Sequence, residues 1–139
     1  MKLHILEELG IARDDFISAA IDHEVLWFDE ECDKSKIEGL VTVKTKLVKD
    51  KLELYPNLKM IAVAFTGYDS VDLEYCSSKN IAVYNVPSYS TNSVAELAIT
   101  LAISLLRDIP KGNEVIRKGQ WDLGRPGIEL LGKTAGICG

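Results

Sequence analysis

Short apolar segments alternate with short amphipathic ones along the first two-thirds of the chain. Five segments rich in β-branched, aromatic or other apolar residues predict strands, at residues 2–6, 24–28, 40–43, 58–65 and 81–84. The segments between them predict helices at residues 14–21, 48–54 and 72–79. The segment at 58–65 is almost continuously apolar, which is typical of a strand covered on both faces and therefore of a parallel sheet. This order of elements predicts an α/β domain with an open, doubly wound parallel sheet.

The pattern changes after Pro87, where the helical segments become longer. Ser93 and Glu96 match a capping box with Ser93 as the N-cap, and they predict a helix that ends near Arg107. This helix is apolar on all sides from Val94 to Leu106, so we expect another domain or another subunit to cover its second face.

A second helix is predicted at residues 110–118, and a Gly-rich connection follows it. Residues 134–139 are typical of the first strand of a further domain. We therefore expect one domain at residues 1–90, and the connecting helices with the start of another domain at residues 91–139.

Composition and charge exclude several classes of partner. The chain has 139 residues, of which 21 are acidic and 16 basic, and it has no cluster of Lys and Arg that would indicate nucleic-acid binding. Its most apolar stretch is shorter than the roughly 20 residues that a membrane span requires, so no membrane partner is expected. The three cysteines are an odd number without a C-x-x-C pair, which indicates free thiols and a cytoplasmic location. His4 and His23 lie at element edges without Cys or acidic residues at ligand spacing, so no metal site is expected.

The loop that follows the apolar strand is the best candidate for a binding site. Ligands of open α/β sheets bind outside the carboxyl ends of the strands, and Thr66, Gly67 and Tyr68 lie at such an end. Gly67 allows a turn with positive φ, which would direct successive N–H groups toward an anion such as a carboxylate. The alternative is an ordinary strand-to-helix turn with Asp72 as the helix cap.

Five segments, in order, resemble one enzyme family. They are Pro-Asn-Leu-Lys-Met-Ile at 56–61, Thr-Gly-Tyr-Asp-Ser-Val-Asp-Leu at 66–73, Asn-Val-Pro-Ser-Tyr-Ser-Thr-Asn-Ser-Val-Ala-Glu at 85–96, Arg-Lys-Gly-Gln-Trp at 117–121 and Leu-Gly-Lys-Thr-Ala-Gly-Ile-Cys-Gly at 131–139. From about residue 41 to the end, the chain resembles the D-isomer-specific 2-hydroxyacid dehydrogenases, which include D-lactate, glycerate and phosphoglycerate dehydrogenases.

The resemblance implies a substrate domain of flavodoxin-like topology and a Rossmann domain that binds NAD, with NADP not excluded. The substrate would be a small 2-keto or 2-hydroxy acid. By position, the backbone amides of Thr66, Gly67 and Tyr68 would hold its carboxylate. Lys44 stands where many members have an arginine near the substrate, and Tyr89 stands where lactate-type members line the substrate cleft.

The same resemblance implies that the chain is the N-terminal fragment of such an oxidoreductase. Gly139 would be the first glycine of the G-x-G-x-x-G fingerprint, and the catalytic arginine, acidic residue and histidine of the family come later in the chain. We therefore assign no catalytic residue here, and we expect residues 1–139 alone to be inactive and to bind no nicotinamide cofactor. We also expect a homodimer, formed through the helix at 94–106 or the strand at 134–139.

Two alternatives from other functional classes remain open from the sequence. One is a standalone flavodoxin-like or receiver-like binding module, although the acidic residues at 29–31 follow one strand only, which is a poor match to the acidic cluster of a receiver. The other is a natural truncated homologue that acts as an interaction protein through its exposed helix.

Overall fold

The chain forms two units, which are Met1–Tyr89 and Ser90–Gly139. The computed structural model describes residues 1–121 and 126–138. Within these ranges no helix is long and apolar enough to cross a membrane.

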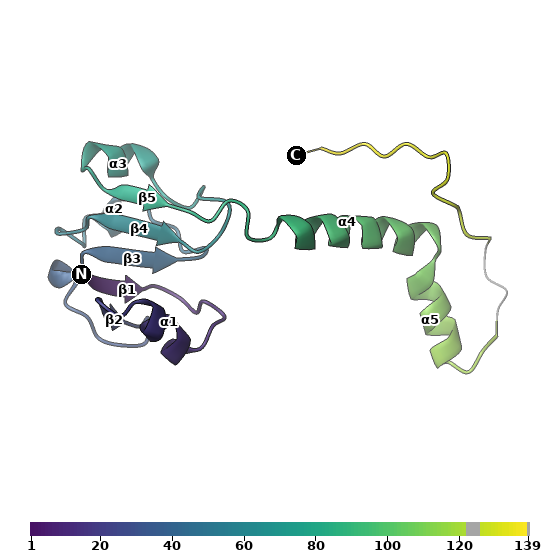
Figure 1. Cartoon of the computed structure of the whole chain (residues 1–139), viewed down its shortest axis with the longest axis horizontal. Coiled ribbons are helices and arrows are strands. Elements are labelled where there is room, and N and C mark those ends of the chain that lie inside the picture. The colour runs from purple at the N-terminus through teal and green to yellow at the C-terminus, as the bar shows by residue number, and fades with distance from the viewer. Residues whose placement is uncertain (122–125, 139) are drawn as a thin grey trace. The chain divides into compact units, whose positions relative to one another are not determined.

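The first unit is built on a sheet of five parallel strands. These are β1 (Lys2–Ile5), β2 (Glu24–Leu26), β3 (Gly39–Thr42), β4 (Met60–Val63) and β5 (Ala82–Tyr84), in the spatial order β2-β1-β3-β4-β5 (Figure 1). Each strand lies within or at the edge of a segment that the apolar pattern predicts, and every neighbouring pair is parallel. The α/β fold with a parallel sheet is thereby confirmed, and its order is that of flavodoxin-like folds.

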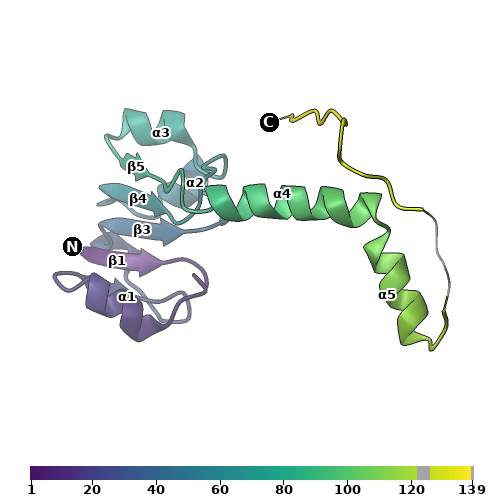
Figure 2. The same ribbon diagram turned by 45° about the vertical axis from the view of Figure 1, so that its right-hand side comes forward.

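Short helices cover both faces of the sheet. They are α1 (Arg13–Ala19), the 3₁₀ turn η1 (Lys34–Lys36), α2 (Lys49–Leu52) and α3 (Leu73–Ser78). The connection from β1 to β2 runs across the sheet in the opposite direction to all later ones, so right-handed crossovers place α1 on one face and η1, α2 and α3 on the other. Figure 2 shows α1 and α2 on opposite sides of the strands.

The larger core lies under α2 and α3. Leu40 of β3 and Ile61 of β4 are fully buried there and pack with residues of the helices and loops, including Leu52 and Cys76. A smaller cluster of Ile5, Trp27 and Val41 lies on the α1 face. Alternate residues of a strand point to opposite faces of the sheet. Because both faces of β3, the central strand, are covered, β3 is buried along its whole length.

The predicted cap of α3 is confirmed, whereas that of the next helix is wrong. The Asp72 carboxylate accepts a hydrogen bond of 2.9 Å from the N–H of Tyr75. The long helix α4 (Thr91–Leu106) begins two residues before Ser93, so Ser93 already has helical geometry and cannot serve as its N-cap. The N–H of Val94 instead donates to the carbonyl of Ser90, as in a helix that begins at Thr91.

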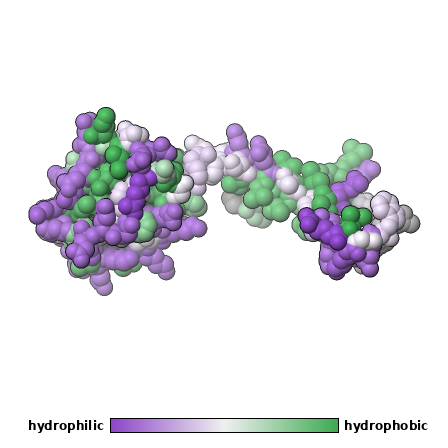
Figure 3. Space-filling model, turned by 90° about the horizontal axis from the view of Figure 1, so that it is seen from below, coloured by the Kyte–Doolittle hydropathy of each residue, from purple (hydrophilic) through white to green (hydrophobic). Residues whose placement is uncertain are grey.

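The second unit contains α4 and α5 (Ile109–Arg117), joined by a turn in which Asp108 has a left-handed φ of 52°. No residue of either helix is buried, and the apolar side chains of α4 are exposed, Leu105 to 78%. Figure 3 shows hydrophobic residues on the surface of this unit.

The expected strand at residues 134–139 is not formed at residues 134–138, and Gly139 lies outside the described residues. A β-strand requires a neighbouring strand to which its N–H and C=O groups can bond. Residues 134–138 have no such neighbour within the described ranges, so an apolar composition alone does not make them a strand.

A single carboxylate ties the end of β1 to the end of β3. Oε1 of Glu7 accepts hydrogen bonds from the Thr42 hydroxyl at 2.7 Å and from the N–H groups of Val43, Lys44 and Thr45 at 2.9, 2.9 and 2.8 Å. Burial acts to raise the pKa of Glu7, but these four hydrogen bonds to the charged form bring it from 4.5 down to about 2.

The depressed pKa of Glu7 predicts an acid-dependent loss of stability. The Glu7 carboxylate stabilises the folded state fully above pH 4.5, which is the pKa of Glu7 in the unfolded chain. This stabilisation is lost as pH falls toward about 2, because Glu7 takes up a proton more readily in the unfolded than in the folded state. For this partly exposed group we expect about 1–2 kcal/mol. Urea unfolding between pH 2 and pH 6 should show wild type more stable than Glu7→Gln at pH 6 and a difference that vanishes near pH 2.

Glu8→Gln is the matched control, because Glu8 is an exposed neighbour that makes no hydrogen bond among the described residues. It should follow the wild-type curve. A gap between wild type and Glu7→Gln that is constant across this pH range would contradict the role of the Glu7 charge.

Candidate functional site

The segments that follow β1, β3, β4 and β5 meet at one edge of the sheet, because all these strands are parallel. Glu7 follows β1, and residues 43–45 follow β3. The loop at 64–70 follows β4, and residues 85–89 follow β5. This edge brings together all of the substrate-binding residues proposed from the sequence.

The loop after β4 has occupied carbonyl groups and unoccupied N–H groups. The carbonyl of Phe65 accepts from the N–H of Val86, and that of Thr66 accepts from the Asn85 amide at 2.7 Å. The Thr66 hydroxyl in turn donates to the carbonyl of Val86. Among the described residues, the N–H groups of Thr66, Gly67 and Tyr68 donate to no protein acceptor. The loop therefore offers hydrogen-bond donors to a ligand, as an anion site must.

The predicted positive φ of Gly67 is wrong. The glycines with positive φ in the described chain are Gly10, Gly119 and Gly132. The chain turns instead one residue later, where the N–H of Val71 donates to the carbonyl of Tyr68. A Cβ added at Gly67 would meet Asp69 Oδ2 at 3.4 Å, an ordinary contact, so neither backbone strain nor crowding within the chain requires a glycine there. A close approach of another molecule to the backbone remains as a physical reason for it.

Lys44 and Tyr89 meet at Phe65, directly before Thr66. The Lys44 Nζ lies 5.9 Å from the centre of the Phe65 ring, and the Phe65 and Tyr89 ring centres are 6.1 Å apart at an angle of 54°. The Tyr89 ring is 56% exposed. A cation and two aromatic rings thus lie beside the loop with the unoccupied amides.

Tyr68 also lines a pocket of about 280 Å³. The other lining residues are Leu73, Val83 and Asn85. Tyr68 is therefore shared between the row of free N–H donors and a pocket formed with residues of α3, of β5 and of the segment after β5.

Three residues of this edge were not predicted from the sequence. The apolar pattern places Phe65 at the end of a strand, Asn85 belongs to a family-like segment without an assigned role, and no role is predicted for Glu7. Asn85 directly follows the end of β5 at residue 84, and Phe65 lies two residues after the end of β4 at residue 63. A position just beyond a strand end is the signal that could have identified both residues. Glu7 bonds to residues 35–38 positions away, for which the local pattern carries no signal.

His4 differs from its predicted setting at an element edge, whereas His23 directly precedes β2 and is exposed, as predicted. His4 lies in β1 and is buried, with Nδ1 3.2 Å from the Tyr55 hydroxyl and 3.5 Å from Cys32 Sγ, although Cys32 is distant in sequence. Burial, and then the charge of Lys34, lower the pKa of His4, which favours a neutral imidazole. Across residues 1–121 and 126–138, no three His, Cys, Asp or Glu side chains converge as metal ligands would.

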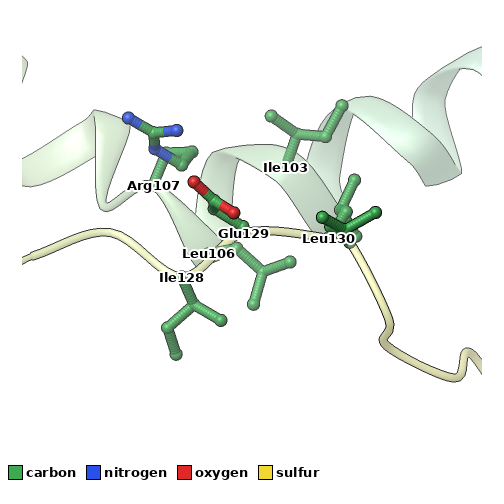
Figure 4. A pocket seen from close by; sticks show the side chains of 7 residues that line it. Ile103, Leu106, Arg107, Ile128, Glu129 and Leu130 are labelled. Carbon is green, nitrogen blue, oxygen red and sulfur yellow. The ribbon is translucent and has the colours of Figure 1, made fainter.

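The second unit has a pocket of its own, of about 290 Å³. Ile103, Leu106 and Arg107 at the end of α4 line it together with residues 128–131 (Figure 4). The N–H of Ile128 donates to the carbonyl of Leu106 at 2.9 Å, so the later segment is attached to the helix end. Its lining is mostly aliphatic, with the Arg107 and Glu129 side chains as the charged groups, and we assign no ligand to it.

Comparisons with known proteins identify the family of the chain. A family model for the catalytic domain of D-isomer specific 2-hydroxyacid dehydrogenases matches residues 17–135. The chain is 36% identical over 140 residues to a D-3-phosphoglycerate dehydrogenase of Methanocaldococcus jannaschii, covering 99% of this chain and 25% of that protein. It is 40% identical over 101 residues to a hydroxypyruvate reductase of Thermotoga maritima, covering 72% of this chain and 33% of that protein.

A solved structure supports the fold. The D-lactate dehydrogenase of Aquifex aeolicus, determined with NAD and lactic acid, superposes with a TM-score of 0.82 at 24% identity, over 94% of this chain and 41% of that one. The chain thus spans between a quarter and a half of the length of these proteins. The family model covers well over half of the chain, and the relatives share up to 40% of aligned residues, so the chain belongs to the D-isomer specific 2-hydroxyacid dehydrogenase family.

Proposed function

We propose that this chain is the N-terminal part of a nicotinamide-dependent D-2-hydroxyacid dehydrogenase and that its first unit is most of the substrate domain. The second unit would then supply the connecting helices and the entry into the cofactor domain. The observation that carries the proposal is the row of N–H groups at Thr66, Gly67 and Tyr68, which point to no acceptor in the described chain. These donors lie at the carboxyl ends of the strands, where α/β enzymes bind their ligands.

The substrate in this proposal is a small 2-keto or 2-hydroxy acid whose carboxylate accepts hydrogen bonds from the loop at 66–68. Charge-assisted hydrogen bonds of this kind are shorter and stronger than those between neutral groups. The Asp69 carboxylate stands next to the loop and repels an anion, so the positive charge of Lys44 is needed to offset it. The Phe65 and Tyr89 rings would shield the bound acid from water.

The cofactor would transfer a hydride to or from C2 of the acid. Solved structures similar to this chain were determined with NAD, with NADPH or with NADP, so NAD and NADP both fit the proposal. The residue of this chain proposed to contact it is Gly139, which lies outside the described residues. The role of this chain's own residues is to bind and orient the acid, and no catalytic group is assigned among them.

The carboxylate site predicts a selective effect of a methyl group at residue 67. Gly67→Ala should leave the free energy of unfolding unchanged or slightly higher, because the residue is under no φ strain and the added Cβ meets only Asp69 Oδ2, at 3.4 Å. The methyl group would stand where the carboxylate approaches the amides, so D-lactate affinity should fall about tenfold or more. Titration with D-lactate, followed by the ¹⁵N–¹H shifts of residues 66–68, measures this.

Gly136→Ala is the matched control, because a Cβ there would have no heavy atom within 4 Å and the residue also lacks a positive φ. It should bind D-lactate as wild type does. If saturating D-lactate moves none of the 66–68 amide signals of the wild type, the proposed substrate site is wrong.

We further propose that residues 1–139 bind no nicotinamide cofactor by themselves and do not turn over a hydroxy acid. The fingerprint glycines and helix N-terminus that hold a pyrophosphate are not among residues 1–138. Isothermal titration with NADH should give no binding heat, and neither should NADPH. Micromolar binding of either one would contradict this part of the proposal.

The exposed apolar side chains of α4 support a homodimer. Val94, Leu97 and Leu101 are each more than half exposed, and a contiguous apolar surface of this kind is typical of an interface. Sedimentation equilibrium over a concentration series should show a monomer–dimer equilibrium. The double variant Leu97→Lys with Leu101→Lys should shift it to monomer, whereas Lys111→Glu on α5 should not. A wild-type protein that stays monomeric at the highest concentration would exclude this interface.

A further inference from the structure

Two neighbouring loops at the same sheet edge present successive backbone N–H groups, and they differ in whether the protein itself fills them. The loop after β3 directs the N–H groups of Val43, Lys44 and Thr45 at one oxygen of Glu7. The loop after β4, the next strand in the sheet, has the unoccupied N–H groups of residues 66–68. We call each set of successive N–H groups an amide nest. The nest at residues 43–45 is filled, because it already binds a carboxylate, and the nest at residues 66–68 is open.

The filled nest lies where this topology would otherwise invite a ligand. The strand order reverses between β1 and β3, and the crevice beside such a reversal is the usual ligand site of an open α/β sheet. Glu7 extends from the end of β1 to the loop after β3 and therefore bridges this reversal. Its four hydrogen bonds, of 2.7–2.9 Å, leave no N–H of residues 43–45 for another anion.

The filled nest also fixes the residue next to the open one. The N–H of Lys44 is bonded to Glu7, while the Nζ of the same residue lies over Phe65, which directly precedes the loop at 66–68. Because Glu7 holds the main chain on both sides of Lys44, it limits the directions from which the lysine side chain can extend.

We propose that Glu7 is a positioning residue that acts as a built-in carboxylate: it occupies the amide nest at residues 43–45, holds Lys44 beside Phe65, and so directs the carboxylate of the substrate to the open nest at residues 66–68. The last part of this statement rests on the proposed function. The first two parts concern the chain alone and are testable without it.

The experiment replaces the carboxylate and then supplies one from solution. Glu7→Ala should lower the unfolding midpoint, and sodium acetate should restore at least half of that loss, whereas sodium chloride at equal ionic strength should not. In the variant, acetate should move the ¹⁵N–¹H signals of residues 43–45, which it should leave unmoved in the wild type. A merely structural gap in packing would not be filled by acetate in preference to chloride.

The position of Lys44 gives a second readout. Its side-chain methylene signals should lose their ring-current shift from Phe65 in Glu7→Ala and regain it with acetate. Lys79 is the internal control, since its Nζ also lies 5.9 Å from a ring centre, that of Tyr75, and is remote from Glu7 in sequence. Its signals should be the same in both proteins.

The outcomes separate this inference from the proposed function. Acetate-induced shifts at residues 43–45 of Glu7→Ala without any D-lactate shift at 66–68 of the wild type would support the built-in carboxylate and refute the substrate site. Absence of any preference for acetate over chloride, in both midpoint and shifts, would overturn the inference itself. If Glu7→Ala does not fold, Glu7→Gln decides the matter: at pH 6 its midpoint should fall and its 43–45 signals should move, and an unchanged protein would overturn the inference.

Discussion

The fold depends on how the backbone N–H groups at the carboxyl ends of parallel strands are satisfied. Inside the sheet each N–H has a neighbouring strand, but beyond the last residue it needs another acceptor. In this chain Glu7 supplies that acceptor for the segment after β3. In the loop after β4 the carbonyls of Phe65 and Thr66 are bonded, while the N–H groups of residues 66–68 donate to no acceptor in the described chain. This difference between the two strand ends separates the part of the edge that the protein itself fills from the part that we propose as the site.

The sheet could be predicted from the sequence because its information is local. Each strand is a short apolar run, and the run at 58–65, without alternation, correctly indicated a parallel sheet covered on both faces. The Asp72 cap was equally local, since donor and acceptor are three residues apart. The Ser93 cap failed because Thr91 and Asn92 are also compatible with a first helical turn, and the pattern of residue types does not say which of several polar residues comes first.

The candidate site was predictable only in part, because most of its contacts join residues that are far apart in the sequence. A loop after an apolar strand gives the position of Thr66–Tyr68, but the pairing of Glu7 with residues 43–45 and of His4 with Cys32 arises from strands that the fold brings together. The resemblance to the family predicted Lys44 and Tyr89 as site residues. The Phe65 ring, which lies near both of them, could not be distinguished from the other apolar residues of its predicted strand. Gly67 was identified by its position after the strand, but its φ is not positive, so the predicted conformational reason for a glycine does not hold.

Glu7 accepts hydrogen bonds from the main-chain N–H groups of residues 43–45 and from the hydroxyl of Thr42, but from no side chain of residues 43–45. Substitution at residue 44 therefore does not remove any of the bonds that hold the loop. The conformation of the loop at residues 43–45 therefore does not depend on which cationic side chain stands at residue 44. In the proposed site, an exchange between lysine and arginine at this position would change how the acid is bound, from a point charge to a bidentate guanidinium, without the loss of any of these hydrogen bonds. Under the proposed function, a point mutation at residue 44 would change the preference for the acid while the loop stays in place.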